Sequence, residues 1–382
     1  MANYDYEIVN GRKIRVRPKE TVSEIDKNGY FRRQPNHFTT PFGDGENDLK
    51  AEGNKRYRLV WAKLCHWSNR AAIVRELEGL EDQISVNMVE HAPHEKNLGW
   101  EYVYNENNID PVLGDQFLSE AYYRADDDYQ GRTTVPALID TTTGKVVNND
   151  YNWLTTYFEV NFLPWHKKGA PELYPVELRE EIDKMNLWLF DNINNAVYRS
   201  SFSRSNEGHF DGVNTFYAAM DRLEKRLETN RFIFGDYVTD SDIRLYVTLA
   251  RLDIRYTTQL GETKRPLYTY KNLWGYAKEL WEIPAFAHHT DFAAIIRQGR
   301  IEGEEDGFRA STHYDLALPK IDWDAQWKVS TERAYLSSDP THPIYLGNNR
   351  RFYIDPTWYD LGAESPKKEE KETPPSCGCC CG

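Results

Sequence analysis

A strand–helix–strand pattern between residues 57 and 88 constrains the fold of this chain more than any other stretch. Apolar residues alternate over 57–61, recur near helical spacing over 72–80, and alternate again over 84–88. A period of two is typical of strands and a period near 3.6 of helices. In this order the three segments predict one βαβ unit with parallel strands, and Cys65 lies in its first turn, where the helix is expected to begin.

Cys65 is the only cysteine before the last six residues. A cysteine in the first turn of a helix faces unpaired backbone N–H groups and the positive end of the helix dipole, which both favour the thiolate. Ser68 completes a C-x-x-S motif, so the thiol can form a mixed disulfide with a small thiol but no internal disulfide. His66 and Arg70 can add positive potential. The alternative is a buried, inert cysteine that only packs.

A predicted hairpin over residues 135–147, with its turn at Thr143-Gly144, supplies a second indication. Val135-Pro136 opens its first strand, and a cis bond there would expose the backbone N–H and C=O of Val135 to a ligand. The alternative is an ordinary trans proline at a sheet edge. The dipeptide lies about seventy residues after Cys65, and this position fits a thiol-binding, thioredoxin-like fold. A short helix should begin near Asp150.

Beyond residue 165 the apolar periodicity is helical only, which predicts an all-helical domain. One helix is expected within 176–198, with an apolar face of Ile182, Met185, Leu189, Ile193 and Val197. A second, within 211–228, has Val213, Phe216, Met220, Leu223 and Leu227. A third begins at a capping box of Thr239 and Asp242, flanked by a hydrophobic staple of Val238 and Ile243. A functional site is expected in the cleft between the two domains.

The ends of the chain lack clear periodicity. We expect an N-terminal extension with little regular structure over 1–54, a thioredoxin-like thiol-binding domain over 55–165, an all-helical substrate-binding domain over 166–300, a C-terminal extension over 301–361, and a disordered cysteine-rich tail over 362–382. The motif CGCCCG in that tail could collect a soft metal, bridge to another chain, be acylated, or carry incidental thiols.

Composition excludes several classes of function. The net charge of −13 argues against nucleic acid as a partner. No apolar run approaches the ~18 residues of a membrane span, the N-terminus has no signal-peptide core, and the cysteines form no distributed disulfide framework. We therefore expect a cytoplasmic protein with no membrane partner.

Several motifs over residues 31–297 resemble one family when their order and spacing are taken together. They are GYFRRQPNHF, LCHWSNRAAIVRELEGLE, GW at 99–100, GRTTVPALID, VVNND, AVYRSSF, FGDYVTDSDIRLYVTLARLD and NLWGY. The chain resembles the glutathionyl-hydroquinone reductases, the Xi-class glutathione S-transferases. The resemblance implies a two-domain α+β glutathione-transferase-like fold. It also implies a homodimer and glutathione as co-substrate, with no metal or nucleotide. The implied reaction cleaves glutathionyl-hydroquinones to hydroquinone and oxidised glutathione.

The resemblance also implies site residues, carried over position by position. Cys65 matches the catalytic cysteine. The glutathione-binding positions are Trp100, Arg132, Val135, Pro136, Asp150 and Tyr151, and the hydroquinone pocket contains Tyr198 and Tyr256. The chain departs from the family where His66 replaces a proline, where Asp150-Tyr151 replaces a Glu-Ser pair, and where Gly299 replaces a third pocket tyrosine.

Two alternatives to the glutathionyl-hydroquinone reductase remain open at this stage. The first is a monothiol, glutaredoxin-like thiol-disulfide reductase that uses another low-molecular-weight thiol, and Asp150-Tyr151 motivates it. The second is a non-catalytic, transferase-like binding module, which the acidic surface, long extension and cysteine-rich tail motivate. Retention of Cys65 at a strand-to-helix turn counts against the second alternative.

Overall fold

A four-stranded sheet forms the centre of the N-terminal half of the molecule. The computed structural model describes residues 4–17, 23–91, 98–256, 260, 265–296, 321–340 and 343–344. Strands β3 (Tyr57–Trp61), β4 (Ile84–Met88), β7 (Ala137–Asp140) and β8 (Lys145–Asn148) lie in the order β4-β3-β7-β8. Strands β3 and β4 are parallel, and the other two pairs are antiparallel. The predicted βαβ unit and hairpin are therefore confirmed.

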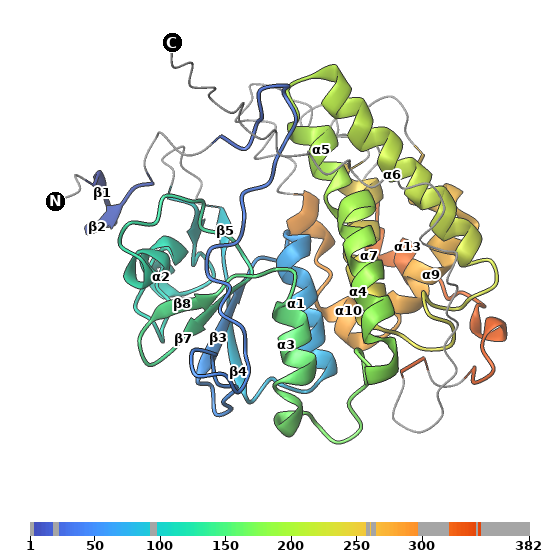
Figure 1. The fold of residues 1–382 in the computed structure, drawn as a ribbon, viewed down its shortest axis with the longest axis horizontal. Helices are drawn as coiled ribbons and strands as arrows, with labels where there is room; N and C mark the ends of the chain where they lie inside the picture. The colour runs from blue at the N-terminus through green and yellow to red at the C-terminus, as the bar shows by residue number, and fades with distance from the viewer. Residues whose placement is uncertain are drawn as a thin grey trace, which may run out of the picture.

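Helices cover both faces of this sheet, which explains why strand β3 is buried along its whole length. Leu59 packs in one core cluster with residues of α1 (His66–Leu77) and α3 (Leu154–Val160). Val60, which points to the opposite face, packs with residues of α2 (Leu118–Ala125). Figure 1 shows α2 on the outer side of the sheet, with α1 and α3 between the sheet and the remaining helices. Helix α1, which follows Cys65, therefore lies between the sheet and the helices of the C-terminal half.

The C-terminal half is helical. Among the described residues, its helices include α4 (Arg179–Leu189), α5 (Ala196–Phe202), α6 (Asn206–Arg226), α7 (Asp240–Arg251), α9 (Lys271–Trp281), α10 (Pro284–His288) and α13 (Trp323–Trp327). The apolar faces predicted within 176–198 and 211–228 are both buried. Helix α7 packs against α1.

Two helical runs contain a π-helical segment, which regular periodicity does not reveal. The helix expected within 176–198 is interrupted at Phe190–Asn194, and α7 continues as a π-helical segment over Leu252–Tyr256. Segments of this kind are rare and frequently occur at functional sites. The first precedes Tyr198 by four residues and the second ends at Tyr256, so each reorients a helix next to a predicted pocket tyrosine.

The start of α7 has the predicted capping box. The Asp242 carboxylate accepts hydrogen bonds from the backbone N–H of Thr239 (2.8 Å) and from its hydroxyl (2.9 Å). It also accepts from the Ile233 N–H and the Tyr276 hydroxyl. Because α7 extends from this box to Arg251, the box fixes the position of the helix that faces α1.

Two regions contain more regular structure than the sequence predicted. In the extension, β1 (Tyr6–Val9) and β2 (Arg12–Arg15) form an antiparallel hairpin. Asn10 and Gly11 connect them with φ of 50° and 80°, the conformation that an Asn-Gly hairpin turn requires. Between residues 90 and 131, the chain contains α2 and the short pair β5 (Glu90–His91) and β6 (Trp100–Glu101).

Short 3₁₀ segments complete the described structure. They are Glu106–Asn108, Leu163–Trp165, Val176–Leu178, Leu267–Thr269 and Ala334–Leu336. None of the helices in the described ranges is both long and apolar enough to cross a membrane. Position 299 and the cysteine-rich tail over 362–382 lie outside the described residues.

Candidate active site

Cys65 is the N-cap residue of α1 and follows the last residue of β3, Trp61, by four positions. Its backbone is extended (φ −83°, ψ 117°), and its side chain is partly exposed. The thiol lies 3.7 Å from the carbonyl oxygen of Val135, to which it donates. The peptide bond between Val135 and Pro136 is cis. The βαβ turn and the start of the hairpin therefore meet at this thiol, as the sequence indicated.

Ser68 fixes the loop that carries the thiol. Its hydroxyl is fully buried, accepts from the Ala62 N–H (3.1 Å) and lies within donating distance of the carbonyls of Ala62 (3.1 Å) and Cys65 (3.3 Å). In the C-x-x-S motif the serine therefore stabilises the turn before the helix. A second thiol at this position would be a resolving cysteine, and this chain has none there.

Arg251, at the end of α7, attaches the helical half to the same loop. Its guanidinium is completely buried and donates to the carbonyls of Leu64 (2.9 Å) and Lys63 (3.0 Å). It also donates to the side chain of Asn69 and to the carbonyl of Val247. Sequence reasoning did not identify this residue. The two residues directly before Cys65 are thus fixed by a side chain nearly 190 positions further along the chain.

Trp100 lies in the core cluster that also contains Val135, and Cys65 packs against this cluster. Its indole N–H donates to the carbonyl of Thr133 (3.1 Å), and its ring stacks on His91 with centroids 3.9 Å apart. The indole therefore belongs to the core cluster on which Cys65 packs, and its one hydrogen-bond donor is already satisfied by the chain.

Arg132 forms a two-point ion pair with Glu24, a residue of the N-terminal extension. Its Nε and Nη2 atoms lie 2.9 Å from the two carboxylate oxygens of Glu24. Burial favours the neutral form of Glu24, but the bonds from Arg132 and from the Gln34 N–H outweigh it, so the pKa of Glu24 is lowered. Sequence reasoning missed Glu24 because the extension has no periodicity that places it.

Asp150 and Tyr151 lie at the turn that leads into α3. The Oδ1 atom of Asp150 accepts from Asn36 (2.9 Å) and from the Asn152 N–H (3.0 Å), and the side chain is only 8% exposed. The carbonyl of Tyr151 accepts from Arg70, a buried residue of α1. The predicted helix near Asp150 begins with this turn, and α3 itself starts at Leu154.

An aromatic cluster lies beside His66 and Trp67, the two residues after Cys65, where α1 meets the helical half. Tyr198 of α5 lies with its ring centroid 5.3 Å from His66, 5.8 Å from Trp67 and 6.5 Å from Tyr256. Burial raises the pKa of Tyr256 well above its usual value, so its phenol stays protonated near neutral pH. The two predicted pocket tyrosines are thus brought together beside the start of α1.

Arg33, a residue of the N-terminal extension, packs against this aromatic cluster. Its guanidinium lies 4.4 Å from the ring centroid of Tyr198 and 4.6 Å from that of Trp67, distances typical of cation–π contacts. Its Nε donates to Asn195 (3.1 Å). Arg33 is part of the motif GYFRRQPNHF, which could have drawn attention to it.

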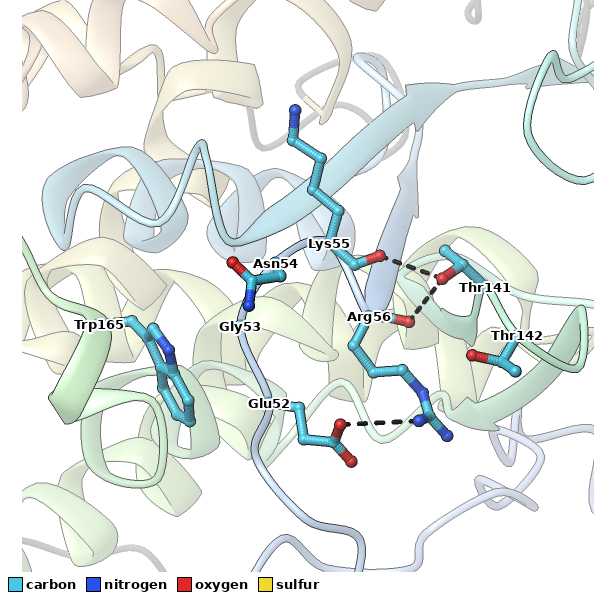
Figure 2. Close-up of a pocket in the computed structure, with 8 residues that line it drawn as sticks. All are labelled: Glu52, Gly53, Asn54, Lys55, Arg56, Thr141, Thr142 and Trp165. Carbon is cyan, nitrogen blue, oxygen red and sulfur yellow. Dashed lines mark hydrogen bonds and ion pairs between the residues drawn. The ribbon is translucent and has the colours of Figure 1, made fainter.

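The hollow in Figure 2 is not part of this site. It has a volume of about 440 Å³ and lies at the start of β3, whereas Cys65 follows the end of that strand. The Thr141 hydroxyl there donates to the carbonyls of Lys55 and Arg56, and Arg56 pairs with Glu52. Across the described residues, no group of three or more His, Cys, Asp or Glu side chains is arranged to hold a metal ion.

Comparisons with known proteins identify relatives of the whole two-domain unit. Residues 197–279 match the family model of the glutathione S-transferase C-terminal domain. The chain is 34% identical over 279 residues to the glutathione S-transferase omega-like 2 of Schizosaccharomyces pombe, an alignment covering 70% of this chain and 88% of that protein. It is 33% identical over 240 residues to the glutathionyl-hydroquinone reductase YqjG of Escherichia coli, covering 63% and 73%.

Solved structures agree with these relatives. A glutathione transferase from Gordonia bronchialis superposes with a TM-score of 0.70 at 32% identity, covering 78% of this chain and 91% of that chain. The glutathione-bound structure of YqjG superposes with a TM-score of 0.65 at 30% identity, covering 78% and 96%. The two-domain glutathione-transferase-like fold predicted from the sequence is therefore confirmed.

Proposed function

This chain belongs to the family of the glutathionyl-hydroquinone reductases, the Xi-class glutathione S-transferases, and we propose that it cleaves glutathionyl-hydroquinones with glutathione as co-substrate. The relatives that carry this activity in their names align with the α/β and helical halves together. The observation that carries the proposal is the position of Cys65, a partly exposed thiol at a helix N-terminus beside Val135 and the cis peptide bond.

We propose that the reaction proceeds through a mixed disulfide on Cys65. The thiolate attacks the sulfur of the conjugate, and a sulfur–sulfur bond forms between Cys65 and the glutathionyl group. The carbon–sulfur bond breaks, its electron pair goes to the ring carbon, and that carbon takes a proton as the hydroquinone leaves. A second glutathione thiolate then attacks the mixed disulfide, which releases oxidised glutathione and regenerates the Cys65 thiolate. Glutathione supplies both electrons, so no metal or nucleotide is required.

The same arrangement supports our proposal for the residues that bind glutathione. The backbone of Val135 lies beside the thiol, and Trp100 is proposed to pack on the ligand from the same core cluster. Arg132 uses Nε and Nη2 toward Glu24, and a guanidinium has five N–H donors in a planar fork. We therefore propose that the ligand carboxylate binds at the terminal edge of Arg132 while Glu24 orients the guanidinium.

Asp150 and Tyr151 are proposed to meet the γ-glutamyl end of the ligand. The Asp150 carboxylate is already hydrogen-bonded by Asn36 and by the Asn152 N–H. Those contacts fix its position, and a ligand ammonium would add a charge-assisted bond to it. Tyr198 and Tyr256 are proposed to hold the hydroquinone ring and its hydroxyls.

The domain boundaries given above, a homodimeric assembly and a cytoplasmic location complete the proposal. The described residues contain one cysteine, Cys65, which is free, as expected in a reducing compartment. Sedimentation equilibrium at micromolar concentration tests the assembly, and a mass of one chain would contradict it.

A second candidate co-substrate is another low-molecular-weight thiol. Asp150-Tyr151 favours it, because the shorter carboxylate is held by the chain itself and the tyrosine ring packs on Trp67 rather than offering a small hydroxyl. Turnover with a panel of reduced thiols distinguishes the two. Turnover at millimolar glutathione supports the first, and turnover with only a different thiol supports the second.

The proposed function is tested by following hydroquinone and oxidised glutathione together after glutathionyl-hydroquinone is mixed with reduced glutathione. The proposed reaction releases the two products in equal amounts, and Cys65→Ser abolishes both. Equal product release by the serine variant would contradict the mechanism, because a hydroxyl is far less ionised than a thiol at neutral pH.

A further inference from the structure

His66, the residue directly after Cys65, is a buried imidazole in contact with the pocket tyrosines. Its side chain is 1% exposed, and its ring packs against Trp67 with centroids 4.2 Å apart. Tyr198 and Tyr256 approach it to 5.3 and 6.0 Å between ring centroids. A buried imidazole is usually stabilised by hydrogen bonds from both ring nitrogens. The hydrogen-bond partners of these two ring nitrogens therefore indicate the role of His66.

Only one of the two nitrogens has close partners. Nδ1 lies 3.0 Å from the hydroxyl oxygen of Tyr256 and 3.4 Å from that of Thr248. Nε2 is buried and has no hydrogen-bond partner among the described residues. Burial, with the guanidinium of Arg251 and three further arginines, holds the pKa of His66 well below its usual value. The imidazole is therefore neutral and has one hydrogen to place.

The position of that hydrogen follows from the cost of leaving each nitrogen without a partner. A hydrogen on Nε2 would leave a buried N–H donor without an acceptor, and such orphaned donors are rare in folded proteins. A hydrogen on Nδ1 leaves only a lone pair on Nε2. It also points at two hydroxyl oxygens, of which the nearer belongs to Tyr256. The contacts thus favour the tautomer in which Nδ1 donates and Tyr256 accepts.

We propose that His66 is a positioning residue that holds the Tyr256 hydroxyl by donating to it from Nδ1, so that the phenolic hydrogen of Tyr256 is free to face the substrate. This inference rests on the function proposed above. When the carbon–sulfur bond breaks, the ring carbon takes its proton from the Tyr256 hydroxyl. The resulting phenolate is stabilised by the Nδ1–H of His66. It regains a proton from the thiol of the second glutathione, which becomes the attacking thiolate.

In this arrangement His66 acts through Tyr256 and not through Cys65. Tyr256→Phe should therefore slow carbon–sulfur cleavage on the order of 10²-fold, the scale of a lost proton donor. His66→Phe, which removes only the hydrogen bond to that donor, should slow it about 3- to 10-fold. His66→Asn keeps an N–H near the Nδ1 position and should restore the rate to within about threefold of the parent.

A double-mutant cycle with single-turnover kinetics tests this dependence. The chain is mixed with glutathionyl-hydroquinone, and hydroquinone release is followed before the second glutathione is added. The proposal predicts that His66→Phe in the Tyr256→Phe background causes no further loss. Additive losses, or a His66→Asn rate as low as that of His66→Phe, would overturn it. Thr248→Val is the matched control, because it removes the more distant hydroxyl near Nδ1 and should change the rate less than twofold.

A spectroscopic measurement keeps the inference separate from the proposed function. ¹⁵N NMR of histidine-labelled protein distinguishes the two tautomers without any substrate. The proposal predicts hydrogen on Nδ1 of His66 and a shift of that signal in Tyr256→Phe. Hydrogen on Nε2, or a signal unchanged in Tyr256→Phe, would overturn it. If the parent chain fails to cleave glutathionyl-hydroquinone, the proposed function falls, and the NMR result alone decides whether His66 positions Tyr256.

Discussion

Replacing Arg251 with methionine should damage both the stability of the chain and the placement of its thiol. The guanidinium is completely buried and supplies hydrogen bonds to the carbonyls of Lys63 and Leu64. Each buried acceptor left without a donor costs about 1–3 kcal/mol. Removing the desolvated charge itself recovers part of that cost. The net loss in the free energy of unfolding is therefore expected to be about 2–4 kcal/mol.

The same change should slow the chemistry, because the two carbonyls belong to the residues directly before Cys65. A displacement of about 1 Å at a reacting group can cost on the order of 10²-fold in rate. Urea denaturation measures the stability, and single-turnover hydroquinone release measures the rate in buffer where the variant is fully folded.

Arg226→Met is the matched control, since Arg226 is also buried and its Nε donates to a carbonyl, that of Ile233, in the helical half. It should lower stability and leave the single-turnover rate within about twofold of the parent. If Arg251→Met loses stability but keeps the rate of Arg226→Met, then Arg251 only maintains the fold. Arg251 would then have no part in placing Cys65.

Three further perturbations test separate parts of the structure. Asp150→Asn keeps an oxygen acceptor for Asn36 but removes the negative charge, so it should raise the Michaelis constant for glutathione about 10- to 100-fold. An unchanged Michaelis constant would show that Asp150 only caps the turn before α3. Thr239→Ala should lower the urea midpoint by the equivalent of about 0.5–2 kcal/mol, since it removes the hydroxyl bond to Asp242, and an unaltered midpoint would contradict that contact. Folding lowers the pKa of His66, so the unfolded chain binds more protons than the folded one as the pH falls below about 6.5. The free energy of unfolding should therefore decrease by ~1.4 kcal/mol for each pH unit below that value. His66→Phe should flatten that dependence, and curves of equal slope for the two proteins would show that His66 is not the group responsible.

The part of the site built by local chain geometry was predictable from sequence. Alternation over 57–61 and the helical spacing after it placed Cys65 at the start of α1, and the Val135-Pro136 dipeptide predicted the segment that meets it. Both depend on patterns within a few residues, where periods of 2 and 3.6 are distinct.

The rest depends on contacts between distant segments, which periodicity cannot supply. The hydrogen bond between His66 and Tyr256 joins residues 190 positions apart. The ion pair between Glu24 and Arg132 brings the N-terminal extension to the segment that leads into Val135 and Pro136. The π-helical segment that ends at Tyr256 also changes which side chains share a face, because it breaks the regular helical period. Only the folded chain shows these relations.

The central claim, that Cys65 is the nucleophile, is tested most directly by mass spectrometry of the intact chain after one turnover. The chain is mixed with glutathionyl-hydroquinone without reduced glutathione, acid-quenched, and measured whole and after proteolysis. The mechanism predicts one glutathionyl group per chain, removable by a reductant and located on the peptide containing Cys65. It also predicts an equal amount of free hydroquinone. Hydroquinone released with no modification at Cys65, or with the group only on Cys377, Cys379, Cys380 or Cys381 of the tail, would contradict the account.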